Sequence, residues 1–265
     1  MKLLISIITL FLFNINYSQN IIIDYNSTIN TNDAVLATSI NYKLIINNES
    51  KTSAYFNNND SINQFKYSQF IDEKVKKDDI TRVKLSDNHY SYIRNDYFFK
   101  NYVQDTLIYN EIVSTKRVTI GEKTNLFNWE IQPKSDTIVM NFKCQRAVAK
   151  FRGRTYEAYF TNQIATYGGP WKFDGLPGLI LSVRSLDNYF VIKPVKITLN
   201  SKENLNVVNI YKEKQIISWS EYKNQFRANM ERRLKLLRSK SEIGEGGSIK
   251  ITDKIEDLEI PEMKL

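Results

Sequence analysis

Short apolar segments separated by polar breaks recur along most of this chain, and the first of them predict connected strands. Branched residues open a strand at residues 21–23, a second apolar run covers residues 35–46, and a third covers residues 52–56. The polar cluster at residues 47–50 has the composition of a turn. This part of the chain therefore predicts an antiparallel hairpin with a further strand after its turn.

Beyond about residue 89 the pattern becomes a series of short aromatic and β-branched segments. A spacing of roughly ten residues with polar pairs between segments is typical of an antiparallel meander. The alternating helices that a parallel sheet requires are absent from the pattern. The segments fall at residues 89–93, 97–99, 107–109, 117–120, 127–131 and 137–150, with turns expected at pairs such as Asn95-Asp96 and Lys134-Ser135.

One amphipathic helix is expected near the C-terminus, over residues 218–239. Ser218 and Glu221 form the pattern of a capping box, and apolar residues repeat at steps of three and four along one face. These are Trp219, Tyr222, Phe226, Met230, Leu234 and Leu237, while the other face carries Lys223, Arg227, Arg232, Lys235 and Arg238. We favour a helix that covers the sheet, and the alternative is a basic helix that lies on an anionic membrane.

Together these elements predict a mainly β (α+β) fold in a single domain over residues 19–265. We expect a strongly curved antiparallel meander, and a half-barrel is the form that would fit these pieces. The helix covers this sheet on its concave side or at one end, and residues 241–265 form a short tail. The half-barrel is an analogy with lipoprotein and lipid carriers.

The first 18 residues have the composition of a secretory signal peptide. Met1 and Lys2 lead into an apolar run over residues 3–13, and a polar stretch follows. This run is shorter than the roughly twenty residues that a membrane-spanning helix needs. We expect cleavage after Ser18 and export to the periplasm or the medium, with no transmembrane segment in the mature chain. No Cys lies near the end of the apolar run, so a lipoprotein is not expected.

Composition restricts the chemistry of the chain. It has 265 residues, a formal net charge of +8, one Cys and one His. These counts exclude an internal disulfide, a multi-Cys metal site and any site with two imidazoles, and we expect neither a metal nor a cofactor. Cys144 lies in an apolar strand, which favours a buried, inert thiol over a cross-link between chains. Export, and the lack of a strand rich in Lys and Arg, argue against a nucleic-acid partner.

The scarce turn-forming residues gather in one segment. Of the nine Gly and five Pro in the chain, six lie between residues 168 and 178. We assign all six to tight turns: Gly168, Gly169, Pro170, Gly175, Pro177 and Gly178. Pro177 presets the second position of a type II turn, whose third position, Gly178, needs a positive φ. The shortage of Gly predicts that little of the remaining backbone adopts positive φ.

Around this segment the chain resembles a known family. The run Gly175-Leu176-Pro177-Gly178-Leu179-Ile180 is the six-residue signature after which the GLPGLI family is named. Similar to the family's other recurrent blocks are Lys143-Cys144-Gln145, Ala147, Phe151-Arg152-Gly153-Arg154 and Gly169-Pro170-Trp171-Lys172-Phe173. The resemblance implies an exported protein of a Gram-negative bacterium. It implies no known activity and no catalytic residue.

Two pairs of residues in these blocks are candidate binding residues. Arg152 and Arg154 flank Gly153 in a predicted hairpin turn, where they could hold a carboxylate or phosphate through paired hydrogen bonds. They could equally be solvated or pair with acids of adjoining strands, and we favour a structural role. Trp171 and Phe173 could form an exposed platform for a partner, while the alternative that we favour places them in the core as plugs.

No catalytic motif identifies an enzyme. The sequence holds no Gly-rich phosphate loop, Gly-x-Ser-x-Gly elbow or His-Glu-x-x-His helix. His89 near Asp87, and Ser220 near Lys223, lack the companion groups of a catalytic site. We therefore expect a non-enzymatic binder of an envelope protein, a peptide or an apolar ligand. The alternative is a carboxylate-dependent envelope hydrolase, although no spacing singles out a pair of acids.

Overall fold

A computed structural model describes residues 20–30, 38–57, 97–201, 207–239, 248–249, 255–261 and 263–264. The expected signal peptide, His89, the predicted strand at residues 89–93 and most of the tail lie outside the described residues. The elements are β1 (Asn20–Ile29), β2 (Thr38–Asn47), β3 (Thr52–Asn57), β4 (Tyr97–Asn101), β5 (Thr106–Val113), β6 (Lys116–Glu122), β7 (Glu130–Val139), β8 (Phe142–Phe151), β9 (Arg154–Thr161), β10 (Leu179–Ser185), β11 (Phe190–Thr198), β12 (Ile216–Ile217), α2 (Trp219–Ser239), β13 (Ser248–Ile249) and β14 (Met263–Lys264).

Two antiparallel meanders join into one sheet. The strand order is β12-β6-β5-β4-β3-β2-β1-β11-β10-β9-β8-β7, so each meander keeps its sequence order and the two meet where β1 pairs with β11. The short β12 runs parallel to β6, while the other pairs of neighbouring strands are antiparallel. The predicted antiparallel meander is confirmed, and β13 and β14 form a separate small pair.

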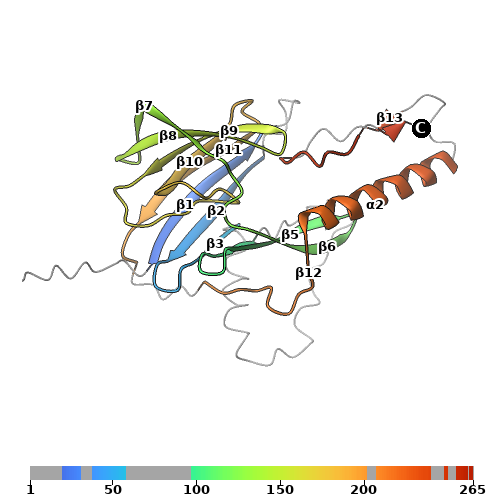
Figure 1. Ribbon diagram of the computed structural model, residues 1–265, viewed down its shortest axis with the longest axis horizontal. Helices are drawn as coiled ribbons and strands as arrows, with labels where there is room; N and C mark the ends of the chain where they lie inside the picture. The colour runs from blue at the N-terminus through green and yellow to red at the C-terminus, as the bar shows by residue number, and fades with distance from the viewer. Residues whose placement is uncertain are drawn as a thin grey trace, which may run out of the picture.

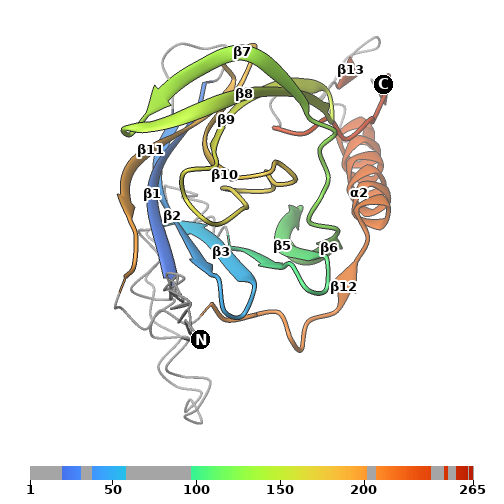
Figure 2. The same ribbon diagram turned by 60° about the vertical axis from the view of Figure 1, so that its left-hand side comes forward.

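A short connection forces this sheet to curve. The strands β6 and β7 are ten places apart in the strand order, which in a flat sheet is about 48 Å at roughly 4.8 Å per strand. Residues 123–129 connect them, and a connection of this length spans at most about 29 Å. The sheet therefore bends into a curved, open wall that brings its two ends towards each other (Figure 2).

Side chains alternate between two buried faces in the first meander. Ile21, Ile23 and Tyr25 of β1 point into the main core on the concave side, and Ile22 belongs to a second cluster on the opposite face. That second cluster includes Tyr211, which follows β11 in the chain and whose hydroxyl donates to the carbonyl of Tyr97 (2.6 Å). Burial on both faces explains why these strands read as nearly continuous apolar runs.

The boundaries of β7 and β8 differ from the prediction. Residues 137–150, expected as one segment, contain a hairpin whose two-residue turn is Met140-Asn141, with φ of 49° and 68°. Lys134-Ser135, expected as a turn, lies inside β7, where the register with β8 shifts between Gln132 and Thr137. A turn formed by Met and Asn carries neither the Gly nor the Pro that a sequence pattern relies on.

The prediction that little of the backbone outside the Gly- and Pro-rich segment adopts positive φ was wrong. Ten described non-glycine residues adopt it, and several lie in strand connections, as Ser114, Arg152 and Asn188 do. Of the predicted turn glycines, Gly168 and Gly175 have φ of 110° and 87°, but Gly178 is not in this region. The type II turn at Pro177-Gly178 is therefore wrong, because Gly178 serves a close approach of two backbones instead: a Cβ there would lie 2.5 Å from the carbonyl oxygen of Thr161.

The helix α2 begins where the sequence predicts. The amide of Glu221 donates to Oγ of Ser218 (3.1 Å), which is the hydrogen bond of an N-cap. Trp219, Tyr222 and Phe226 pack against the main core, and the elements that the helix contacts are β5 and β6. It thus lies at one end of the sheet, where its first turns pack on the core, and its remaining turns run past the sheet (Figure 1). Nothing in the described part of the chain is a helix of the length and hydropathy needed to cross a membrane.

Replacing Gly178 by Ala is expected to lower the free energy of unfolding by about 1–3 kcal/mol, the range for an overpacked site. The new methyl group would meet the backbone of Thr161, which is fixed in β9. A matched control is Gly121→Ala, where the nearest atom is Cγ2 of Ile216, a side chain that is 47% exposed on the edge strand β12. This control should cost less than Gly178→Ala, because an exposed residue of a two-residue edge strand can shift where the backbone of β9 cannot. Equal losses in urea denaturation would contradict the close-approach explanation.

Candidate functional site

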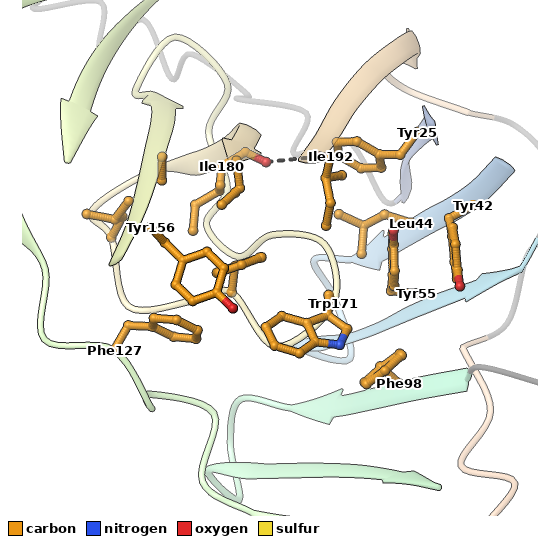
Figure 3. Packing of buried hydrophobic residues seen from close by; sticks show 14 of the residues in the cluster. Tyr25, Tyr42, Leu44, Tyr55, Phe98, Phe127, Tyr156, Trp171, Ile180 and Ile192 are labelled. Atoms are coloured by element: carbon orange, nitrogen blue, oxygen red, sulfur yellow. Dashed lines mark hydrogen bonds between the residues drawn. The ribbon is translucent and has the colours of Figure 1, made fainter. Parts of the chain in front are cut away.

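Residues 162–178, here called the interior loop, leave the sheet after β9 and cross its concave side before β10 begins (Figure 2). Its Trp171 and Phe173 are 6% and 0% exposed. Figure 3 shows Trp171 among Phe98, Tyr156 and Phe127, and ring centroids lie 6.4 Å apart for Trp171 and Phe98. Both rings lie in the core, as the favoured alternative predicted, and Phe173 has no exposed surface that a partner could contact.

The start of β10, which follows the interior loop, is joined both to β1 and to the loop itself. The hydroxyl of Tyr25 on β1 donates to the carbonyl of Ile180 (2.9 Å), and the amide of Ile180 donates to the carbonyl of Gly168 (2.8 Å). Leu179 and Ile180 are fully buried. The second half of the signature is thus an anchor in the core.

A buried lysine holds the backbone of the interior loop. Lys100 on β4 is 1% exposed, and its Nζ donates to the carbonyls of Gly169 (3.1 Å) and Phe173 (2.8 Å) and to Oδ2 of Asp174 (3.0 Å). Burial lowers the pKa of Lys100, and the nearby Asp174 carboxylate opposes that change. The ammonium supplies hydrogen bonds that the loop carbonyls cannot obtain from water in the core.

Arg152 does hold carboxylates, but they belong to its own chain. It donates to Oε1 of Glu256 (2.5 Å) and to both carboxylate oxygens of Glu122 on β6. Tyr109 donates to Oε2 of Glu122 (2.6 Å), and Lys172 of the interior loop pairs with Glu256. We call Tyr109, Glu122, Arg152, Lys172 and Glu256 the ion cluster. Its two cations and two anions balance.

Aromatic rings enclose the ion cluster. The guanidinium carbon of Arg152 lies 3.7 Å from the ring centroid of Trp219 in α2, and Nζ of Lys172 lies 3.9 Å from that of Tyr109. Cations over aromatic faces are stabilised by the ring quadrupole. The cluster therefore ties the sheet, the interior loop, the start of α2 and the segment around Glu256 to one another.

Arg154, like Arg152, contacts an acid and an aromatic ring of its own chain. Its Nε donates to the carbonyl of Ile255 (3.1 Å), its guanidinium pairs with Asp187, and the guanidinium carbon lies 3.8 Å from the ring centroid of Tyr189. Both arginines of the predicted hairpin turn, which is confirmed with φ of 41° at Arg152 and 84° at Gly153, pair with acids of their own chain. This is one of the alternatives that the sequence left open.

Burial and neighbouring charges shift the pKa values of Glu122 and Tyr109. Burial alone raises the pKa of Glu122, but the hydrogen bonds and charge of Arg152, with Lys172 and Tyr109, outweigh it and hold that pKa below its usual range. Burial and the carboxylates of Glu256 and Glu122 raise the pKa of Tyr109. Glu122 is therefore ionised at neutral pH, and the Tyr109 phenol is not.

A cavity of about 420 Å³ opens at the surface beside the signature. It lies between the turn that joins β2 and β3, the first residues of the interior loop and the first half of the signature. Its lining residues are Asn48, Lys51, Asn162, Ile164, Ala165, Thr166, Tyr167, Leu176, Pro177 and Gly178. A hydrogen bond between Oγ1 of Thr166 and Oδ1 of Asn48 (2.6 Å) joins the two walls.

The cavity has an apolar side and a polar side. Ile164 and Leu176 are 5% exposed within it, and Tyr167 is 44% exposed. Lys51 is an exposed cation, and no Asp or Glu is among the lining residues that the structure describes. The cavity thus lacks the carboxylate pair that the hydrolase alternative requires.

The remaining candidate residues form no reactive centre in the described part of the chain. Cys144 is 1% exposed, and burial raises the pKa of its thiol to about 11, as expected for an inert cysteine. Among the described residues, no three of His, Cys, Asp and Glu come close enough together to hold a metal ion.

Sequence reasoning missed Lys100 and most of the ion cluster. Lys100 follows Phe98 by two residues in one strand, so period-two alternation would have placed it on the core face. No comparable signal points to Glu122 or Glu256, because they meet Arg152 from 30 and 104 residues away.

Comparisons with known proteins concern the fold. No family model and no curated protein matches the chain. The solved structure of PNGF-II in a P21 crystal form is similar with a TM-score of 0.51 and 14% identity, over 80% of this chain and 34% of PNGF-II. The chain therefore spans about a third of the length of PNGF-II, and the likeness shows the fold alone.

Two further structures have lower scores. An uncharacterized conserved protein from Thermus thermophilus matches with a TM-score of 0.36 and 7% identity, over 76% of this chain and 91% of its own. A domain from Vibrio parahaemolyticus described as an outer membrane lipoprotein-sorting protein matches at 0.30 and 6%, over 71% and 87%. Scores of this size support no conclusion about role.

The substitution Arg152→Met is expected to lower the free energy of unfolding by about 3–5 kcal/mol, because it leaves two buried carboxylates without their shared partner. The matched control is Lys223→Met, whose partner Glu259 has a side chain that is 71% exposed, and it should cost about 0–1 kcal/mol. Chemical denaturation measures both values. Similar small losses in the two variants would show that the ion cluster does not hold these segments together.

Protonation of Glu122 should also lower the free energy of unfolding in acid. Its folded pKa is lowered, so its contribution is complete above the unfolded pKa of about 4.3 and is lost as the pH falls through the lower folded pKa. Below about pH 4 the wild type should therefore lose stability with falling pH more steeply than Glu122→Gln. Parallel curves of unfolding free energy against pH would contradict this.

Proposed function

We propose that this chain is an exported protein of the GLPGLI type that acts in the periplasm or outside the cell as a non-enzymatic binder of an envelope protein, a peptide or an apolar ligand. The N-terminal pattern of residues 1–18 supports export. The ordered sequence blocks between residues 143 and 183 support the family. The cavity beside the signature is the site that we assign to binding.

This assignment rests on one observation: some residues of the signature are buried in the core, and others line the cavity. Leu179 and Ile180 are fully buried anchors, while Leu176, Pro177 and Gly178 line the cavity. A volume of about 420 Å³ lies within the range of ligand sites in proteins. The scarce Gly and Pro residues thus shape one wall of an accessible cavity.

The lining indicates the kind of group that binds. Pro177 and the ring of Tyr167, which is 44% exposed, offer apolar surface to an aliphatic or aromatic group, while Ile164 and Leu176 are almost fully buried. Lys51 offers a cation at the other wall. The best match is an apolar group next to a carboxylate or another hydrogen-bond acceptor, carried by a peptide or a small molecule.

The dye 1-anilinonaphthalene-8-sulfonate, which joins aromatic rings to an anion, is a suitable probe. The substitution Ala165→Trp fills the cavity and is expected to weaken dye binding about tenfold, equivalent to about 1.4 kcal/mol. Lys51→Ala should weaken binding of this dye but not of the uncharged dye Nile red. Fluorescence titration measures each dissociation constant.

The matched control is Val195→Trp, which adds the same ring on β11 at a position that is 58% exposed and outside the cavity lining. It should leave dye binding unchanged, and all variants should keep the wild-type melting temperature. Unchanged dye affinity in folded Ala165→Trp would overturn the cavity as the binding site. Mass spectrometry of the chain purified from its source would then identify what co-purifies.

A further inference from the structure

The second half of α2 is a cationic projection from the sheet. A helix of 21 residues is about 31 Å long, and Trp219, Tyr222 and Phe226 in its first turns are the residues that pack on the main core. Figure 1 shows the later turns running past β5 and β6, away from the curved wall. Among the residues that the structure describes, packing on the main core therefore involves the first turns of this helix.

Residues 227–236 are strongly basic. They contain Arg227, Arg232, Arg233 and Lys235 against Glu231, a net charge of +3, and all five side chains are exposed. Of the ion pairs among the described residues, one involves this helix, and it joins Lys223 near the start to Glu259. The charge of the later turns is thus directed to solvent.

An apolar side chain accompanies these cations. Leu236 is 62% exposed and lies three and four residues after Arg233 and Arg232, which places the three on one helical face. An exposed leucine between arginines matches the interface of an anionic bilayer, where an apolar group enters the acyl boundary and guanidinium groups bind lipid phosphates.

We propose that the projecting half of α2, from Arg227 to Leu236, docks the protein on membranes that contain anionic phospholipid. The contact is peripheral, since the described helix lacks the hydropathy of a membrane span. It leaves the cavity beside the signature, on another part of the surface, open to its own ligand. The proposal does not depend on the cavity function.

Co-sedimentation with lipid vesicles tests this surface. The full chain should bind vesicles of phosphatidylcholine mixed with phosphatidylglycerol, bind pure phosphatidylcholine vesicles much more weakly, and dissociate as salt is raised. The double variant Arg232→Glu with Arg233→Glu should weaken binding at least about thirtyfold, from about fivefold for each basic residue that is lost. Leu236→Asn should weaken it as well.

The controls separate a specific surface from the overall charge of +8. Lys193→Glu with Lys196→Glu changes the net charge by the same amount at exposed positions of β11, and Val195→Asn removes an exposed apolar side chain there. Both controls should bind the mixed vesicles as the wild type does.

Three results would overturn the proposal. The first is wild-type chain that fails to bind the mixed vesicles, and the second is equal loss in the two charge-reversed variants. The third is a chain that binds duplex DNA but not vesicles and that loses its DNA binding when Arg232 and Arg233 are substituted. This result would assign the surface to nucleic acid. Circular dichroism melting should show each variant folded, because all the substituted positions are exposed.

Discussion

The short connection between β6 and β7 is the constraint from which most of this architecture follows. Because residues 123–129 cannot span a flat sheet of this width, the sheet curves and encloses a concave space lined by apolar side chains. That space must be filled, since an empty apolar interior forfeits packing. The interior loop fills it with Trp171 and Phe173, and its carbonyls obtain their hydrogen bonds from the buried Lys100. A loop in a core is stable only when such a donor is present.

Buried charge is the second consequence of this arrangement. The interior loop carries Lys172 into the core, where it meets the Glu256 carboxylate that Arg152 also binds. Each charge is expensive to bury alone, and the balanced cluster is stable because every member has a partner. The same contacts bring the start of α2 and the segment around Glu256 against the sheet. The direction in which α2 leaves the sheet thus depends on the ion cluster.

Two surfaces with different chemistry result from this core. The cavity beside Pro177 is small, and its described lining combines apolar and polar residues without a carboxylate. The projecting half of α2 is cationic and carries the exposed Leu236. One is shaped by the anchored signature and the other by the polar pattern of the helix. A protein that docks on a membrane and binds an apolar or acidic group there would use both.

The sequence by itself determined most of the described strands, the Arg152-Gly153 hairpin and the helix with its Ser218 cap. These depend on side-chain periods of 2 and 3.6 residues and on local hydrogen bonds. Tertiary structure alone decided that Lys100 would serve the loop carbonyls, that Gly178 would permit a close approach to Thr161, and that Arg152 would meet Glu256 across 104 residues of chain. The physical reason is that these contacts depend on how the curved sheet brings distant segments together, and period and composition carry no information about that separation.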